Sequence, residues 1–176
     1  TVLPNFVPVG NISTDDGHSE IVISNTNPGA FDITLNGAID NTFGATTITN
    51  AGGNIIANAG AKIVSNGQIS SGVNGIVLAA DKGYIGSSTA RLQTESSLLN
   101  ASALNSIYIN EFSGDLVLDS IDSSAGDIDL LSLGSILDGN ADNATNVRAT
   151  TGQVKLSAQG GSIGSGGVNP LTGETN

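Results

Sequence analysis

Short runs in which apolar and polar residues alternate dominate this chain. The clearest lie between Ser106 and Gly139, where each run has aliphatic residues at its first and third positions and a variable residue between them. A period of two is typical of a β-strand with one buried face. The gaps are too short and too polar for helices, so four short strands are predicted, at Ile107-Tyr108-Ile109, Leu116-Val117-Leu118, Ile128-Asp129-Leu130 and Ile136.

The same unit extends through the chain from Glu20 onward. Runs at 21–23 and 31–35 predict strands, and Asn/Gly-rich turns follow each of them. A short helix over 96–103 is the one local alternative, and Asn100 and the flanking serines disfavour it. Single isoleucines then recur every six to nine residues between small polar corners, at Ile39, Ile48, Ile55, Ile63, Ile69 and Ile76.

Three segments repeat one another, starting at Gly75, Asp127 and Gln153. Each has an aliphatic-x-aliphatic strand, a glycine and, two residues after that glycine, an isoleucine. Repetition at this scale predicts stacked units, and strands this short predict an all-β fold, a parallel β-helix with Gly, Asn and Ser corners. An antiparallel β-sandwich is the alternative, but its strands are usually longer. The inward residues predicted are Ile76, Leu78, Ile107, Ile109, Leu116, Leu118, Ile128, Leu130, Ile136, Val154, Leu156 and Ile163, with Val77, Asp129 and Lys155 pointing outward.

The chain divides into two parts. Residues 1–19 contain Pro4 and Pro8 and several apolar residues, which predicts an extended lead-in that covers the first coil. Residues 20–176 form the β-helix repeat domain. Residues 161–175 restart the pattern of 83–96 without completing it, so we expect this domain to be an excerpt or a subunit of a longer array.

Composition narrows the possible partners. Aromatic residues are 3% of the 176 residues, which suits a narrow aliphatic core better than a compact globular one. The net charge is −11 and the five basic residues are scattered, which argues against nucleic acid and against an anionic membrane surface. Cysteine is absent, so no disulfide or thiolate site exists. No apolar run is long enough to insert into a membrane.

Candidate chemistry is sparse, and no catalytic, cofactor or metal residue is predicted. His18 is the only histidine and lacks a nucleophile motif near it. A Thr46-Thr47 pair with Thr49 is too small for a regular threonine face, and the glycosylation sequons at Asn11, Asn100 and Asn143 are uninformative. The densest acidic region could serve as paired acid and base or hold Ca²⁺, but we expect solvated outward charge; it comprises Asp115, Asp119, Asp122, Asp127, Asp129 and Asp138.

The repeats resemble those of filamentous haemagglutinin-type exoproteins of two-partner secretion and related large bacterial surface adhesins. The resemblance is carried by 126–130 with 134–136, by 152–158 with 161–163, and by 107–111 before 114–116. It implies a right-handed parallel β-helix shaft, secreted to the bacterial cell surface. The secretion domain of that family is not evident in residues 1–50.

We therefore expect a non-catalytic structural segment of an extracellular adhesin or fibre. Its expected partners are further coils of the same chain, or copies of itself end to end, and a surface glycan or protein. The alternatives are a carbohydrate-active β-helix enzyme, a glycan-binding module and a self-assembling filament subunit. Aromatic and polar residues that converge on one outer face would favour an enzyme or a lectin, whereas a Ser/Thr/Asn face would favour the shaft.

Overall fold

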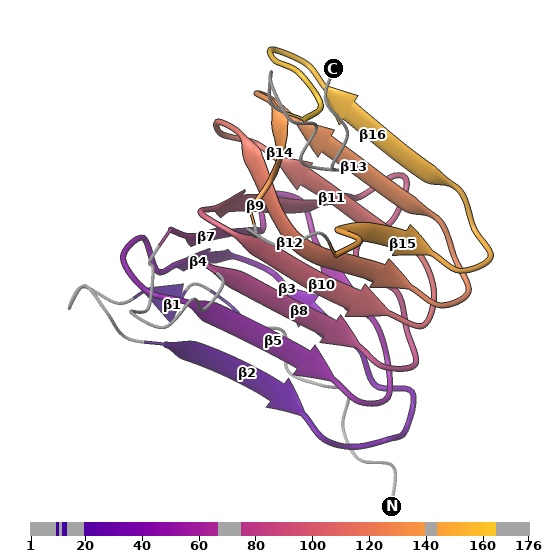
Figure 1. The fold of residues 1–176 in the computed structure, drawn as a ribbon. Coiled ribbons are helices and arrows are strands. Elements are labelled where there is room, and N and C mark those ends of the chain that lie inside the picture. Colours follow the sequence, from indigo (N-terminus) through magenta and orange to yellow (C-terminus); the bar gives the residue numbers. More distant parts are fainter. Residues whose placement is uncertain (1–9, 11, 14–19, 67–74, 140–143, 165–176) are drawn as a thin grey trace, which may run out of the picture.

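The chain folds as a parallel β-solenoid of about five turns (Figure 1). The structure, a computed structural model, describes residues 10, 12–13, 20–66, 75–139 and 144–164. Within these ranges every paired strand runs parallel to its neighbours and no helix occurs. The all-β, parallel β-helix prediction is confirmed, and the sandwich alternative is wrong. The expected lead-in and the isoleucine Ile69 lie largely or wholly outside the described residues, although Ile12 and Ser13 form an edge strand.

Two long sheets and one short one make up the walls of the solenoid. Sheet 1 contains, in spatial order, β1 (Ile12–Ser13), β4 (Ala38–Asp40), β7 (Lys62–Ser65), β9 (Leu92–Ser96), β11 (Ile107–Glu111), β13 (Ile128–Ser132) and β16 (Val154–Ala158). Sheet 2 contains β14 (Ile136–Asp138), β12 (Leu116–Ser123), β10 (Leu99–Ala103), β8 (Ile76–Ala80), β5 (Thr46–Asn50) and β2 (Ile21–Asn25), with β15 (Val147–Ala149) also paired to β12. The third sheet pairs β3 (Ile33–Leu35) with β6 (Ile55–Ala57).

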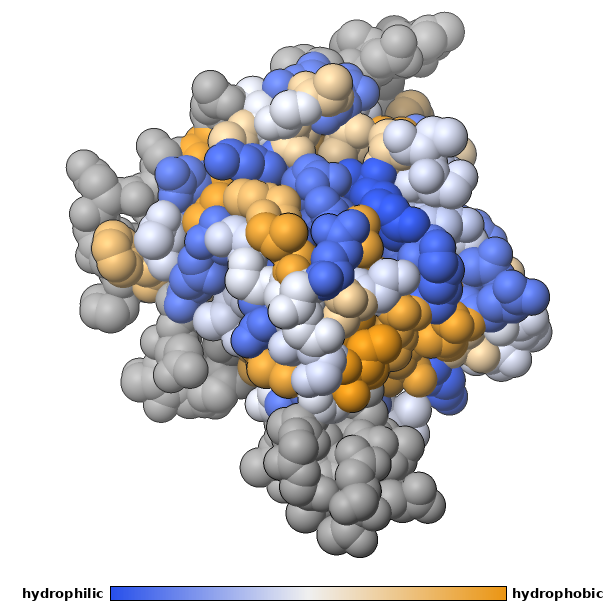
Figure 2. All heavy atoms as spheres, turned by 90° about the horizontal axis from the view of Figure 1, so that it is seen from above, coloured by the Kyte–Doolittle hydropathy of each residue, from blue (hydrophilic) through white to orange (hydrophobic). Residues whose placement is uncertain are grey.

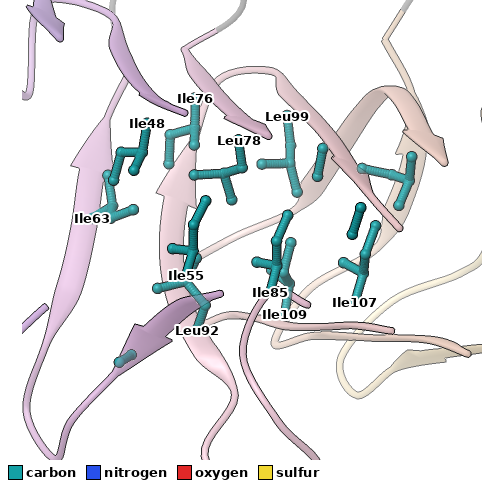
Figure 3. Packing of buried hydrophobic residues seen from close by; sticks show 14 of the residues in the cluster. Ile48, Ile55, Ile63, Ile76, Leu78, Ile85, Leu92, Leu99, Ile107 and Ile109 are labelled. Carbon is teal, nitrogen blue, oxygen red and sulfur yellow. The ribbon is translucent and has the colours of Figure 1, made fainter. Parts of the chain in front are cut away.

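The core is a stack of aliphatic side chains between the sheets. Figure 3 shows Ile48, Ile76, Leu78 and Leu99 of sheet 2 pointing toward the isoleucines and leucines of the opposite wall. Parallel pairing keeps like positions aligned, since Ile107 pairs with Ile128 and Ile109 with Leu130. Each coil therefore adds one layer to a continuous column. The period-two prediction is confirmed for nine of the predicted residues, all fully buried: Ile76, Leu78, Ile107, Ile109, Leu116, Leu118, Ile128, Leu130 and Ile136.

The last described coil keeps this register, but two of its apolar residues are exposed. Val154 pairs with Ile128 and Ile163 bridges to Ile136, so both face the same way as buried residues one coil earlier. Their exposed fractions are nevertheless 45% and 47%. Leu156 is partly buried. Apolar surface beside hydrophilic surface is visible from this end of the molecule (Figure 2).

The local repeats occupy different walls of the solenoid. The segments starting at Asp127 and Gln153 are true neighbours, because β13 pairs with β16 and Ile136 with Ile163. The segment starting at Gly75 instead forms β8 of sheet 2. A strand followed by a glycine corner occurs in both long sheets, as after β8 and after β13, so the pattern alone does not assign a wall. The helix considered over 96–103 is absent, and β9 and β10 occupy that stretch.

Glycines stack where successive corners touch backbone to backbone. A Cβ placed on Gly83 would lie 2.2 Å from the carbonyl oxygen of Gly53, and one on Gly152 would lie 2.1 Å from that of Gly126. Neither distance is possible without moving the main chain. These glycines are therefore required by close approach between coils.

We expect Gly83→Ala to destabilise the chain by about 3 kcal/mol, because the methyl group meets a backbone carbonyl that is held by its own coil. Gly10→Ala is the control, since nothing lies within 4 Å of its Cβ position, and it should change the free energy of unfolding by less than about 0.5 kcal/mol. Urea unfolding of the two variants measures the difference. Equal midpoints would contradict the assigned contact.

Candidate functional site

Several predicted acidic residues hold adjacent coils together. A side-chain oxygen of Asp115 accepts a hydrogen bond from the backbone N–H of Ser135 at 2.7 Å, and one of Asp127 accepts from that of Gln153 at 2.9 Å. Each donor lies at the equivalent corner one coil later. We call residues that make this bond inter-coil caps; the described ones are Asp32, Asn54, Ser106, Asp115, Asp127 and Ser135.

Caps at the same corner of successive coils form a continuous series of hydrogen bonds along the solenoid axis. Asp32 accepts from the N–H of Asn54 at 2.8 Å, and Asn54 accepts in turn from that of Tyr84 at 3.0 Å. Ser106 likewise accepts from the N–H of Asp127 at 3.0 Å. Every cap stands directly before the inward aliphatic residue that starts the next strand. The carboxylates among them satisfy backbone donors that the corner would otherwise leave unpaired.

The other predicted carboxylates are also engaged. Asp119 accepts from the side-chain amide of Asn100 at 2.9 Å, and Asp138 from that of Asn146 at 2.9 Å. Asp122 forms an ion pair with Arg148. In the described part of the chain no three Asp, Glu or His side chains lie close enough together to hold a metal ion.

Asp129 points outward as predicted, but its environment differs from the expected solvated charge. Its carboxylate lies 2.5 Å from the guanidinium of Arg91 and 3.5 Å from the ammonium of Lys155. Its side chain is only 15% exposed. Arg91 also donates to the backbone oxygen of Asp129 at 2.8 Å, and its guanidinium lies 6.0 Å from the centre of the Tyr108 ring. This cluster spans four successive strands of sheet 1 on their outer side, from Arg91 at the start of β9 to Lys155 in β16.

Glu111 is a buried carboxyl that the sequence reading did not single out. It ends β11 at an inward position and is 1% exposed. The hydroxyl of Thr94 donates to it at 2.9 Å, and the backbone N–H of Ser96 donates at 3.1 Å. Burial raises the pKa of Glu111 to about 8; the two hydrogen bonds lower it and nearby Glu95 raises it further. The group is therefore largely protonated at neutral pH.

The remaining candidates form no site in the described residues. Thr46 points into the core, while Thr47 and Thr49 point outward and donate to Glu20 and Ser24. The threonine cluster is thus split between two faces of one strand. His18, Asn11 and Asn143 lie outside the described residues.

The outer faces of the two long sheets differ in chemistry. Sheet 2 carries a row of valine, threonine and asparagine in register, from Val22 through Thr47 and Val77 to Asn100, and further along it the Asp122–Arg148 ion pair. Sheet 1 carries three of the five basic residues, together with two aromatic rings and several carboxamides. The ammonium of Lys62 lies 5.1 Å from the centre of the Phe112 ring. By the criterion of converging polar and aromatic residues, sheet 1 is the candidate functional face.

Neither a scan against protein-family models nor searches of curated proteins and of solved structures finds a match to this chain. The fold places the chain in the class of parallel β-solenoid repeat proteins. No helix among the described residues is long and apolar enough to cross a membrane.

Proposed function

We propose that this chain is a structural shaft segment of a bacterial extracellular adhesin or fibre, of the filamentous haemagglutinin type. The observation that carries the proposal is the way its polar side chains are used. The caps bond each coil to the next, and the Arg91–Asp129 ion pair reaches across β11 to join β13 to the start of β9, so most of the predicted acidic region serves cohesion along the axis. A shaft needs such cohesion, because every coil contacts only its neighbours.

Modularity of the coils is the first test. Deleting residues 107–127 removes one turn and brings Ile128 into the position of Ile107, with which it pairs. We expect this variant to fold into a shorter solenoid with one cooperative urea transition at a lower midpoint. Deleting only 107–115 is the control. It removes fewer residues but takes away β11 and leaves β12, so it should abolish the transition. The opposite ranking would contradict the modular shaft.

Location is the second test. Antibodies against residues 20–164 should label intact cells of the source bacterium without permeabilisation. Labelling that requires permeabilised cells would overturn the extracellular role and leave the fold assignment untouched.

The exposed apolar residues of the last described coil favour a second candidate function, a self-assembling filament. Val154 and Ile163 continue columns that are fully buried one coil earlier, at Ile128 and Ile136. Another coil, from the same chain or from a second copy, would cover them. Head-to-tail contacts between copies build an open filament rather than a closed oligomer. Light scattering over a concentration series tests whether a second copy supplies this coil. A constant monomer mass at millimolar concentration would exclude it.

A further inference from the structure

Two corner loops leave the solenoid beside each other, and the core does not require their length. Ile85 and Leu92 pair with Ile107 and Ile109 of the next coil. Six residues, 86–91, therefore separate Ile85 from Leu92, whereas a single residue separates Ile107 from Ile109 in the next coil. Residues 58–61 likewise join β6 to β7 with four residues. In the preceding coil only two residues separate the partner positions, Leu35 and Ala38. Loops that protrude from a rigid scaffold commonly carry binding sites.

The two loops enclose a hollow of about 340 Å³. Its lining includes the exposed small residues Ala59, Gly60 and Ala90, beside Ala57 and Ala61, which belong to the buried core. Polar residues of both loops and of the start of β9 also line it: Asn58, Thr89, Arg91 and Gln93. The volume falls at the lower end of the range for small-molecule sites, roughly 300–1,000 Å³.

These polar residues are held in place before any ligand arrives. Backbone bonds of 2.9 Å and 3.2 Å connect Ser87 and Ala90 in both directions and close the 87–90 turn. Asp129 fixes the guanidinium of Arg91. Gln93 donates to the backbone oxygen of Arg91 at 3.1 Å and accepts from Asn110 at 2.6 Å. Side chains fixed in this way lose little conformational entropy on binding.

We propose that this hollow binds a neutral saccharide of one or two rings. The small lining residues Ala59, Gly60 and Ala90 leave room for a pyranose ring, and the hydroxyl, carboxamide and guanidinium groups beside them suit its hydroxyls. An anionic sugar is disfavoured, because Arg91 is already paired with Asp129 and the chain carries a net charge of −11. A peptide is disfavoured as well, since β9 already pairs with β7 and β11 and offers no free edge.

This site is independent of the shaft role, and it is tested on the whole chain by amide NMR. The probes are the methyl glycosides of glucose, galactose, mannose and N-acetylglucosamine, each titrated to tens of millimolar, with glucuronic acid alongside. We expect at least one neutral glycoside to shift the amides of 57–61 and 86–93 with a dissociation constant of about a millimolar. No shift with any neutral probe, shifts located elsewhere, or shifts with glucuronic acid alone would overturn the proposal.

Variants of the lining residues sharpen the test. Thr89→Val removes one hydroxyl and should weaken the binding about fivefold, the effect of one neutral hydrogen bond. Ala90→Leu fills the hollow and should abolish the binding. Thr47→Val, on the outer face of sheet 2, makes the same replacement away from the site and should leave the affinity unchanged. Unchanged affinity in both loop variants, with amide spectra otherwise intact, would also overturn the site.

Discussion

Ile128→Asp is expected to destabilise the chain by about 5 kcal/mol, close to the whole stability of many domains. Ile128 is fully buried and its side chain belongs to the central aliphatic column. It pairs with Ile107 on one side and with Val154 on the other. A carboxylate there would have no partner, and burying an unpaired charge is among the costliest single changes known in proteins. Urea unfolding followed by circular dichroism measures the loss.

Leu133→Asp is the matched control for this prediction. Leu133 lies in the same coil, one residue beyond β13, and is 52% exposed. The same kind of replacement should there change the free energy of unfolding by about 0.5 kcal/mol or less. If the two variants unfolded at similar urea concentrations, the inward and outward assignment of this coil would be wrong.

Glu111→Gln is expected to stabilise the chain at alkaline pH and to have little effect at acidic pH. The pKa of Glu111 is about 8 in the folded chain against 4.5 as its usual value. The folded state therefore keeps a proton that the unfolded state releases between these two values. Stability from this group is fully present below pH 4.5 and is lost as the pH rises through about 8, by about 5 kcal/mol at most. Glutamine keeps both hydrogen bonds, because its amide can donate to Thr94 and accept from Ser96.

Urea midpoints at pH 5 and pH 8.5 test this expectation. The parent should lose stability between the two values much more than Glu111→Gln does. Glu20→Gln is the control, because Glu20 is an exposed glutamate in another coil, and its replacement should leave the pH dependence of the parent in place. A parent whose midpoint rises with pH, or one that matches Glu111→Gln at both values, would show that Glu111 is not a buried protonated acid.

Most of the fold is predictable from the alternation of residues, because register in a parallel solenoid follows from which face is apolar. Ile107 and Ile109 illustrate this, since their spacing alone indicates the inward face. The assignment of strands to walls was not predictable. Ile76 and Ile128 share a local pattern yet belong to different sheets, and only pairing between residues more than twenty positions apart separates them.

The polar chemistry was harder to predict. Asp127 and Asp129 lie two residues apart, yet one caps a backbone N–H of the next coil and the other joins Arg91, which is 38 residues away in the sequence. One signal was available: a side chain with an oxygen acceptor stands directly before the first inward aliphatic residue of a strand at every described cap. Glu111 also continues the inward alternation of Ile107 and Ile109, so its position in the period predicts burial despite its charge.

Close stacking of the coils sets the reach of any shaft built from this fold. Asn25 and Asn50 occupy the same position in successive coils, 25 residues apart. Neighbouring strands in a sheet lie about 4.8 Å apart, so each residue advances the axis by only about 0.2 Å, against about 3.3 Å in an extended strand. A projection of about 500 Å would thus consume roughly 2,600 residues at that spacing. A cell that uses such a shaft therefore synthesises many residues for each unit of length and gains stiffness. Selection for longer reach would act chiefly by duplicating coils.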